Sequence, residues 1–327
     1  MSPDLIKQIN SNARHLLELN RTEFDALGIE TKSLPNNNER GAEVFDFGKT
    51  SNVAAGQLLA RICMADLADI NLLTKEPVVA GCYDWVGVQT KHPLVSCMAA
   101  QYAGWPLSVD KYFAMCSGPA RSARGKEAVL EEYQLIAVAD SVVAVLETGK
   151  LPDESVAEAI ANECNVAPDR VQLCVAPTSS VAGAIQIVAR SVETAIHKLH
   201  ELKFDLSVIK AGRGSAPLPP PAKDDLVALG WTNDSILYGA EVDLTVECED
   251  AVLEEIGPKV PASSSSDFGT PFLEIFERFD RDFYRIDKML FSPARIAFKN
   301  MRTGNRFGFG KQRWDILSES WCVSSDD

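Results

Sequence analysis

The sequence lacks the cysteine and histidine patterns of metal and disulfide proteins. Its eight cysteines are scattered and no two form a C-x-x-C pair, which excludes the usual spacing of a structural zinc site or a disulfide framework. Cys82, Cys97 and Cys174 stand among apolar residues, so we expect small buried thiols there. With only four histidines in 327 residues, a mechanism that depends on histidine has few candidates.

Long apolar runs and an excess of basic residues are also missing. No run approaches the roughly 18 apolar residues needed to span a bilayer, and residues 1–20 alternate polar and apolar positions, unlike a secretion signal. We therefore expect a cytoplasmic protein with no membrane partner. The net charge of −14 argues against nucleic acid as a partner, because phosphate contacts need clustered Lys and Arg.

The familiar phosphate-binding and nucleophile motifs are absent as well. The sequence has no P-loop, no G-x-G-x-x-G after a strand, no G-x-S-x-G and no H-E-x-x-H. What it contains is an alternation of strands and helices. A strand at Val44–Gly48 precedes a helix from Val53 to about Asp69, and a strand at Val171–Pro177 precedes a second long helix. Ser235–Glu247 reads as a strand pair or one bent strand. The pattern predicts an α/β (α+β) fold.

A weak internal similarity suggests how this fold is divided. "TSNVAAGQLLAR" (Thr50–Arg61) resembles "TSSVAGAIQIVAR" (Thr178–Arg190), each lying between a strand and a long helix. Such a similarity favours two alike α/β subdomains within one compact unit. We place the halves at 1–125 with the C-terminal strands of about 285–327, and at 126–284.

The segment Gln186–Leu202 predicts an amphipathic helix with charged residues beside its apolar face. At about 100° per residue, its apolar stripe is formed by Val188, Val192, Ile196 and Leu199. Arg190, Glu193 and His197 lie along one flank of that stripe, on neighbouring turns.

Three interpretations of this flank are open from the residues alone. The first is a surface salt bridge between Arg190 and Glu193, which stabilises a helix by about 0.3–0.5 kcal/mol. The second is a metal site of Glu193, His197 and His200, although the adjacent arginine would repel a dication. The third is catalytic, with the carboxylate as general base for a water and the guanidinium holding it in a fixed orientation.

Loops dense in glycine and small polar residues are candidates to face this helix. They are Ser117–Ser122, Pro177–Gly183, Gly230–Gly239 and Ser263–Phe272. The first is a plain Gly-Pro turn or an anchor for an anionic or amide ligand through Arg121. The second places hydroxyls at a helix N-terminus, as a cap or as part of an anion site. In the third, Asn233 and Asp234 form an Asx-type turn before a strand or a pair that recognises a ring.

Taken together, the segments resemble the methenyltetrahydromethanopterin cyclohydrolase family. The matching pieces, in chain order from about residue 40 to residue 300, are "QYAGW", "DKYFAM-SGPAR" with Cys116 in the gap, "VAPTSSVAG-IQ-VAR-VETA-HK", "TNDSILYG", "SSDFGTPF-EIF" and "DFYRID-LFSPA". Archaeal members carry a lysine where this chain has Tyr102, so the chain looks more like the bacterial branch, in which the pathway oxidises formaldehyde.

The resemblance implies a reaction, a fold and a set of residues. The enzyme would reversibly hydrolyse the methenyl bridge of a tetrahydromethanopterin-type carrier to the 5-formyl form. It would do so in a pocket between two α/β subdomains of a homotrimer, without metal or organic cofactor. The catalytic pair of the family's R-x-x-E corresponds to Arg190 and Glu193. We expect the pterin substrate to be bound by Tyr102, Ser117, Gly118, Arg121, Thr178, Ser180, Gln186, Asn233, Asp234, Ser266 and Asp267. His197 is expected only to pack. A non-catalytic pterin-binding protein is a further alternative.

Overall fold

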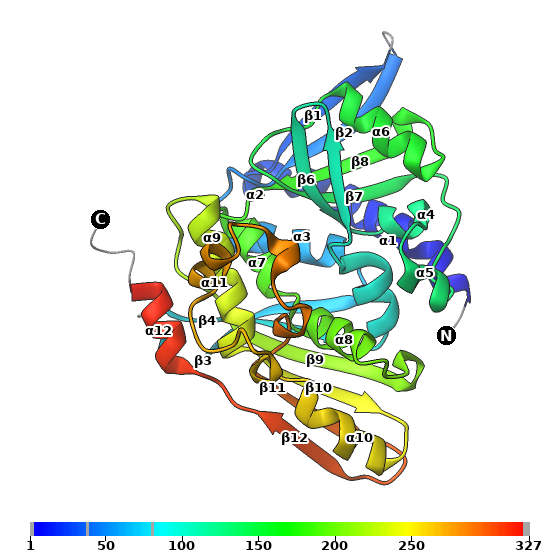
Figure 1. Ribbon diagram of the computed structural model, residues 1–327. Coiled ribbons are helices and arrows are strands. Elements are labelled where there is room, and N and C mark those ends of the chain that lie inside the picture. Colours follow the sequence, from blue (N-terminus) through cyan, green and yellow to red (C-terminus); the bar gives the residue numbers. More distant parts are fainter. Residues whose placement is uncertain (1–2, 37–38, 80–81, 323–327) are drawn as a thin grey trace. The chain divides into compact units, whose positions relative to one another are not determined.

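The computed structural model describes residues 3–36, 39–79 and 82–322 (Figure 1). These residues form two compact units, each with its own six-stranded mixed sheet. Unit 1 comprises Met1–Ala68 and Val95–Gln186, and unit 2 comprises Asp69–Leu94 and Ile187–Asp327. The mixed α/β fold with two α/β subdomains that the sequence predicts is thereby confirmed. The chain changes unit at these points, whereas the sequence placed the divisions near residues 125 and 285.

Unit 1 is a sheet with helices on both faces. Its elements are α1 (Pro3–Asn20), η1 (Arg21–Glu23), α2 (Phe24–Leu27), β1 (Glu30–Asn36), β2 (Glu39–Asp46), α3 (Val53–Cys63), the π-helix η2 (Leu94–Gln101), β5 (Trp105–Val109), β6 (Tyr112–Ser117), α4 (Ala120–Arg124), α5 (Ala128–Glu132), β7 (Val142–Glu147), α6 (Glu154–Cys164), η3 (Pro168–Arg170), β8 (Val171–Ala176) and α7 (Val181–Val188). The strand order is β1-β2-β8-β7-β6-β5. The strands β2, β8 and β7 are mutually parallel, whereas β1, β6 and β5 pair antiparallel with their neighbours.

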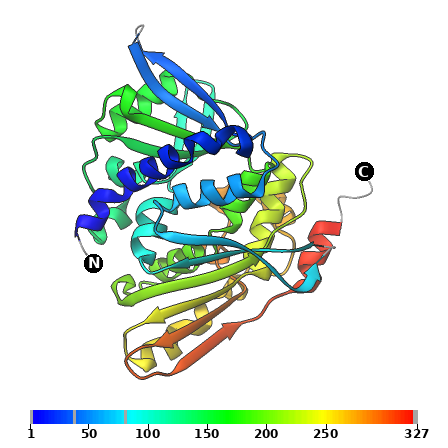
Figure 2. The ribbon, with the colours of Figure 1, turned by 180° about the vertical axis from the view of Figure 1, so that it is seen from behind.

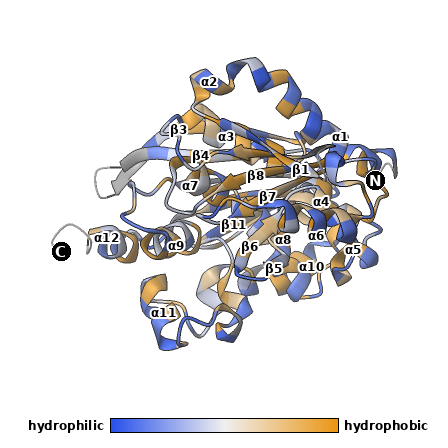
Figure 3. Cartoon of the chain, turned by 90° about the horizontal axis from the view of Figure 1, so that it is seen from above, coloured by the Kyte–Doolittle hydropathy of each residue, from blue (hydrophilic) through white to orange (hydrophobic). Residues whose placement is uncertain are grey.

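The two faces of this sheet are buried by different helices. Alternate residues of β7 and β8 point to opposite faces, and apart from Gln172 and the terminal Glu147 both strands are apolar, because both faces are covered. One face packs against α6, and the other packs against α1, α3 and Ala182 of α7. Figure 2 shows α1 and α3 crossing the sheet when it is seen from behind. In Figure 3, β8 is coloured mainly as hydrophobic, while α1 carries both colours, as an amphipathic surface helix should.

The two similar segments of the sequence follow strands of the same sheet, although residues 187–190 of the second segment already belong to unit 2. Thr50–Arg61 leads from β2 into α3, and Thr178–Arg190 leads from β8 into α7. Since β2 and β8 are adjacent parallel strands, the two strand-to-helix connections are neighbours within one sheet. The similarity therefore does not relate the two subdomains, and that use of it was wrong. The similarity reflects the same local structure used twice, a strand-turn-helix connection with small residues in the first turn of the helix.

Unit 2 also consists of a sheet and the helices that pack on it. Its elements are β3 (Ala68–Val79), β4 (Cys82–Thr90), α8 (Ser191–Glu201), η4 (Leu206–Val208), β9 (Ile209–Pro217), α9 (Asp225–Asp234), the π-helix η5 (Ser235–Gly239), β10 (Glu241–Val246), α10 (Asp250–Ile256), η6 (Gly257–Lys259), η7 (Ala262–Ser264), α11 (Phe272–Arg278), η8 (Phe283–Arg285), η9 (Lys288–Leu290), β11 (Arg295–Asn300), β12 (Arg306–Gly310) and α12 (Trp314–Cys322). The strand order is β12-β11-β10-β9-β4-β3, with β10 and β11 parallel. Helix α8 packs on β9 and β10, and a separate apolar cluster joins α9, η5, α11 and α12.

Two local predictions were wrong. The helix expected over Gln186–Leu202 is interrupted, since α7 ends at Val188 and α8 begins at Ser191. The strand expected over Ser235–Glu247 starts only at Glu241. Before it, the π-helix η5 continues from α9, and the Ser235 hydroxyl donates to the Trp231 carbonyl at 2.9 Å. Its apolar residues are buried in the cluster around α9, so tertiary packing overrides the strand propensity of this segment.

Within the part of the chain that the structure describes, no helix is both long and apolar enough to cross a membrane. The cysteines expected to be buried follow the prediction where they can be checked, since Cys97 and Cys174 are fully enclosed. The side chain of Cys82 lies outside the described residues.

Candidate functional site

The charged flank of the predicted helix lies at the N-terminus of α8. Arg190 is the N-cap residue, and Glu193 is the third residue of the helix. A carboxylate in the first turn is stabilised by the helix dipole. Both side chains are buried, with Arg190 7% and Glu193 4% exposed. The interpretation as a solvent-exposed surface salt bridge is therefore wrong.

Close packing against the sheet holds this first turn in place. The predicted apolar stripe is fully buried from Val188 to Leu199. Beneath it, Gly214 on β9 leaves room for Ser191, because a Cβ built on Gly214 would lie 2.5 Å from the Ser191 Oγ. Helix α8 can thus approach β9 closely at the turn that carries Arg190 and Glu193. A site that depends on orientation benefits from such rigid support.

The metal interpretation finds no ligand set. Among residues 3–36, 39–79 and 82–322, no group of three His, Cys, Asp or Glu side chains is placed to hold a metal ion, and Glu193, His197 and His200 are no exception. Burial lowers the pKa of His197 to about 4, even though the Glu201 carboxylate lies 3.8 Å away and opposes the shift. His197 is therefore neutral at physiological pH, in keeping with a packing role.

In unit 1, Arg121 is enclosed by its own protein. Its side chain is 0% exposed, and its Nε donates to Glu127 at 2.9 Å while Nη2 forms an ion pair with the same carboxylate. Its Nη1 donates to the carbonyls of Met98 and Ala100 at the end of η2. The guanidinium also lies 4.9 Å from the centre of the Tyr102 ring. Its donors thus join η2 to the connection between α4 and α5, which leaves little capacity for an anionic ligand.

Ser117 and Gly118 form the turn that leads into Arg121. Gly118 has φ +91°, and its N–H donates to the Ala100 carbonyl at 2.8 Å. A Cβ at this position would also lie 3.2 Å from the Val143 carbonyl oxygen, so the turn requires glycine. Ser117 is 2% exposed, and its Oγ lies 3.3 Å from the Cys63 sulfur. Burial raises the pKa of Cys116 well above its usual value, which excludes a thiolate nucleophile there.

The hydroxyls that follow β8 have defined partners. The Ser180 Oγ accepts from the Gly183 N–H at 3.0 Å, so this residue caps α7, one of the two roles left open by the sequence. The Thr178 hydroxyl donates to Oε1 of Glu147 at 2.8 Å. Gln186 is almost fully buried, at 2% exposure, in the last turns of α7.

Asn233 and Asp234 end helix α9 and do not form a turn before a strand. The Asn233 Nδ2 donates to the Leu229 carbonyl at 2.8 Å. Asp234 is 0% exposed, and its two oxygens accept from the Phe272 N–H at 2.8 Å and the Ser320 hydroxyl at 2.6 Å. Because both oxygens are used within unit 2, Asp234 links the start of α11 to the last turn of α12 rather than presenting a free carboxylate.

The burial of Asp234 predicts a pH-dependent stability. Burial raises its pKa from 3.8 to about 7, so between these values the folded state binds more protons than the unfolded state. The contribution of protonated Asp234 to the free energy of unfolding is therefore fully present below about pH 4 and is lost as the pH rises through about 7. We expect Asp234→Asn to be about 1–3 kcal/mol more stable than the wild type at pH 8. Urea unfolding at pH 5 and pH 8 measures this.

A matched substitution controls for charge removal alone. Asp243 lies on β10 with an exposed side chain, so Asp243→Asn should keep the pH dependence of the wild type. If the stability of Asp234→Asn varied with pH between 5 and 8 as that of the wild type does, burial of this carboxyl would not be the cause.

The loop that holds Ser266 and Asp267 is tied to Asp287 and to itself by hydrogen bonds. The Asp267 carboxylate accepts from the Asp287 N–H at 3.2 Å, while Ser266 is exposed. The buried Lys198 of α8 donates to the Ser264 hydroxyl at 3.0 Å and to the Met289 carbonyl. Burial lowers the pKa of Lys198 to about 8. The sequence gives no sign that this lysine is buried, because nothing in its helical spacing distinguishes it from a solvent-exposed residue.

The predicted site residues divide between the two units. Unit 1 holds those from "QYAGW", "SGPAR" and the β8–α7 segment, and unit 2 holds those from α8 onward. Unit 1 also has a surface groove of about 680 Å³, which lies along α1 and Val138–Ser141. None of the predicted site residues lines this groove, so it is not the candidate site.

Comparison with known proteins decides which family these features belong to. The family model described as cyclohydrolase (MCH) matches residues 8–321. The chain is a member of this family. Methenyltetrahydromethanopterin cyclohydrolases of Rhodopirellula baltica and Methanococcoides burtonii are 48% and 42% identical to it, over 86% and 91% of this chain and 86% and 92% of theirs. The Methylobacillus flagellatus enzyme is 37% identical over 99% of this chain and 97% of its own.

Membership of the cyclohydrolase family confirms the resemblance that the sequence motifs suggested. The match extends over both units and includes every motif from "QYAGW" to "LFSPA". Similar relatives come from bacteria and archaea alike, so the bacterial branch stays a prediction.

Proposed function

We propose that this cyclohydrolase hydrolyses the methenyl bridge of 5,10-methenyltetrahydromethanopterin or a close analogue to the 5-formyl form, with Glu193 as general base and Arg190 as its partner. The observation that carries the proposal is a carboxylate and a guanidinium buried together on the first turn of α8, in a chain of this family. A carboxylate held in a buried helix start next to a guanidinium is suited to accept a proton from an attacking water.

The reaction needs no covalent intermediate with the protein. The bridging carbon is bonded to N5 and N10, which share one positive charge, so water can attack it directly. Glu193 stabilises that cation and takes one proton from the attacking water. The C–N10 bond then breaks, N10 keeps its electron pair and gains a proton, and the formyl group stays on N5. One proton is released overall for each water consumed. Arg190 orients the carboxylate and can donate to the oxygen that develops negative charge.

The remaining residues divide into contacts and supports. Tyr102, Ser266 and Asp267 are at least partly accessible, and we assign them to substrate contact. We assign Ser117, Gly118, Thr178, Ser180, Gln186 and Asn233 to shaping the site, because Ser117 and Gln186 are buried and the others already have hydrogen-bond partners. We assign Arg121 and Asp234 to positioning, because their polar atoms already have partners within their own units.

The direct test is a spectroscopic assay with purified protein. Methenyltetrahydromethanopterin absorbs through its conjugated amidinium, which hydrolysis destroys. We expect catalytic loss of this absorbance when protein is added and none with heat-inactivated protein. No acceleration over buffer would contradict the proposal. A non-catalytic pterin-binding protein would bind the carrier without consuming it.

We also propose the cytoplasm as the place of action and a homotrimer as the assembly, which the family resemblance supports. Light scattering coupled to size-exclusion chromatography measures the assembly. A mass near three times 35.6 kDa is expected, and a mass near 35.6 kDa would contradict it.

A further inference from the structure

The carboxyl ends of β7 and β8 mark a topological switch point in unit 1. The two strands are adjacent and parallel, with Glu147 opposite Ala176 at their ends. After β7 the chain enters α6 on one face of the sheet, and after β8 it enters α7 on the opposite face. In open α/β sheets, ligands bind beyond the carboxyl ends of the strands at such a point.

Glu147 occupies this point as the last residue of β7. It is half-buried, and its Oε1 accepts from the Thr178 hydroxyl at 2.8 Å. The bond joins the loops that follow the two strands and holds the carboxylate in one orientation. No Lys, Arg or His within the described ranges forms an ion pair with it, so its charge is not balanced by a nearby cation. A carboxylate that is oriented and uncompensated is suited to a ligand with N–H donors.

The neighbouring carboxylate at the same edge of the sheet is different. Asp46 ends β2, and its Oδ1 accepts from the Gly48 N–H at 2.8 Å. Its Oδ2 lies 3.9 Å from the Lys49 ammonium. Because Asp46 is engaged by its own loop, Glu147 is the better candidate.

We infer that Glu147 binds the 2-amino-4-oxopyrimidine edge of the substrate's pterin ring, with Thr178 as the positioning residue. That edge carries two adjacent donors, the 2-amino group and N3–H, which match the two oxygens of a carboxylate. Each carboxylate oxygen has a second lone pair, so the bond from Thr178 can persist when the ring binds. The inference rests on the proposed function, since it names the group that recognises the same substrate.

The first experiment is the kinetics of Glu147→Gln with methenyltetrahydromethanopterin. The amide oxygen can still accept from the Thr178 hydroxyl. The amide NH₂, however, would face an N–H donor of the pterin ring, so one of the two hydrogen bonds to the ring is lost. We expect KM to rise about 10- to 100-fold while kcat stays within about threefold. Thr178→Val leaves the carboxylate but removes its orientation, so KM should rise in the same direction by a smaller factor. Glu147→Asp retains the charge and should restore part of the affinity lost in Glu147→Gln.

The second experiment asks which ring edge is recognised. 6-Methylpterin carries the 2-amino group, whereas 6-methyllumazine has an oxygen in its place and differs little otherwise. Both compounds are tested as competitive inhibitors of the wild type. We expect the pterin to bind at least about 10-fold more tightly than the lumazine. Glu147→Gln should lose this preference. A purely structural role for Glu147 would weaken both inhibitors alike.

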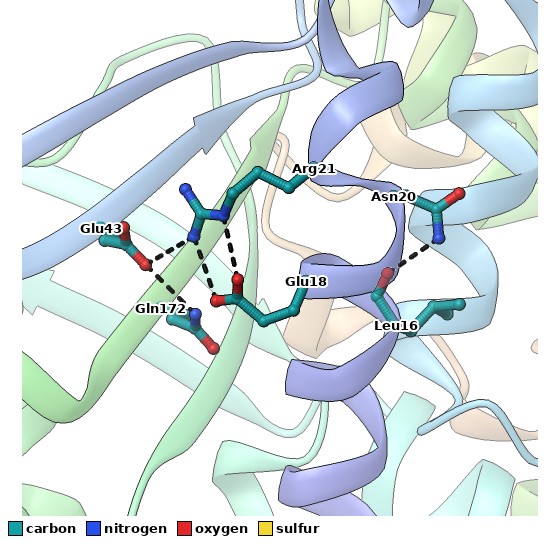
Figure 4. A network of polar contacts seen from close by, with 6 residues as sticks. All are labelled: Leu16, Glu18, Asn20, Arg21, Glu43 and Gln172. Atoms are coloured by element: carbon teal, nitrogen blue, oxygen red, sulfur yellow. Dashed lines mark hydrogen bonds and ion pairs between the residues drawn. The ribbon is translucent and has the colours of Figure 1, made fainter.

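A matched control uses another partly buried glutamate of the same sheet. Glu43 of β2 accepts from Arg21 at 3.0 Å and from Gln172 at 3.3 Å, in a network that ties the end of α1 to the sheet (Figure 4). Glu43→Gln should lower thermal stability and leave KM and the inhibitor preference unchanged. Turnover by the wild type with an unchanged KM in Glu147→Gln would overturn this inference alone. Absence of turnover by the wild type would overturn the proposed function.

Discussion

Glu193→Gln is expected to lower kcat by about 1,000-fold or more while the substrate still binds. A general base contributes roughly 10²–10⁴-fold, and the upper part of this range is expected for the group that takes the proton from the attacking water. The amide is nearly the same size and can keep its place in the first turn of α8, so KM should change little. Single-turnover absorbance loss and equilibrium binding of the methenyl carrier separate the two effects.

A second glutamate on the same helix provides the control. Glu201 ends α8, where it lies 3.8 Å from His197. Glu201→Gln should retain kcat within about twofold. If Glu193→Gln kept more than a tenth of the wild-type rate, Glu193 would not be the base. A loss of binding in parallel with turnover would instead indicate that the substitution damages the fold of α8.

Arg190→Ala has the second largest expected effect, with kcat reduced about 100- to 1,000-fold. Removal of the guanidinium takes away both the group that orients Glu193 and a donor for the developing oxygen. Because the Arg190 side chain is 7% exposed, truncation also leaves a space beside the helix start. Added guanidinium ion at millimolar concentration, below denaturing levels, should fill it and restore part of the rate.

The charge and the space have separate controls. Arg213 is an exposed residue of β9, so Arg213→Ala removes one positive charge from unit 2 and should leave kcat unchanged. Arg190→Lys keeps a charge without the planar fork and should recover only part of the rate. If sodium chloride restored the rate of Arg190→Ala as well as guanidinium chloride does, a specific role for the Arg190 guanidinium would be contradicted.

The elements that the sequence predicted well are those in which burial and periodicity agree. The apolar stripe from Val188 to Leu199 repeats with the helical period, and every member is fully buried. The start of α6 also follows local rules, since it carries an acidic first turn and the Asp153 side chain caps the helix by accepting from the Val156 N–H. Sequence periodicity did not reveal the interruption at Arg190, because no proline or glycine marks it.

The polar loops were found from the sequence, but their roles were not. Arg121 and Asp234 stood in motifs typical of ligand contact, and each is enclosed by partners distant in sequence, such as Met98 and Ser320. Glu147 lies at the end of an apolar strand, and no sequence pattern distinguishes it from an ordinary carboxylate at a strand end. Its significance comes from the strand order, which the sequence does not display.

The amino-acid sequence alone determined the family, the alternation of strands and helices, and the pair of charged residues on the flank of one helix. These follow from motif order and from periodicities that act over a few residues. Only the tertiary structure decided which polar groups are already engaged and which are available. That choice depends on contacts between residues far apart in the chain, since a buried donor or acceptor must find its partner wherever the fold places one.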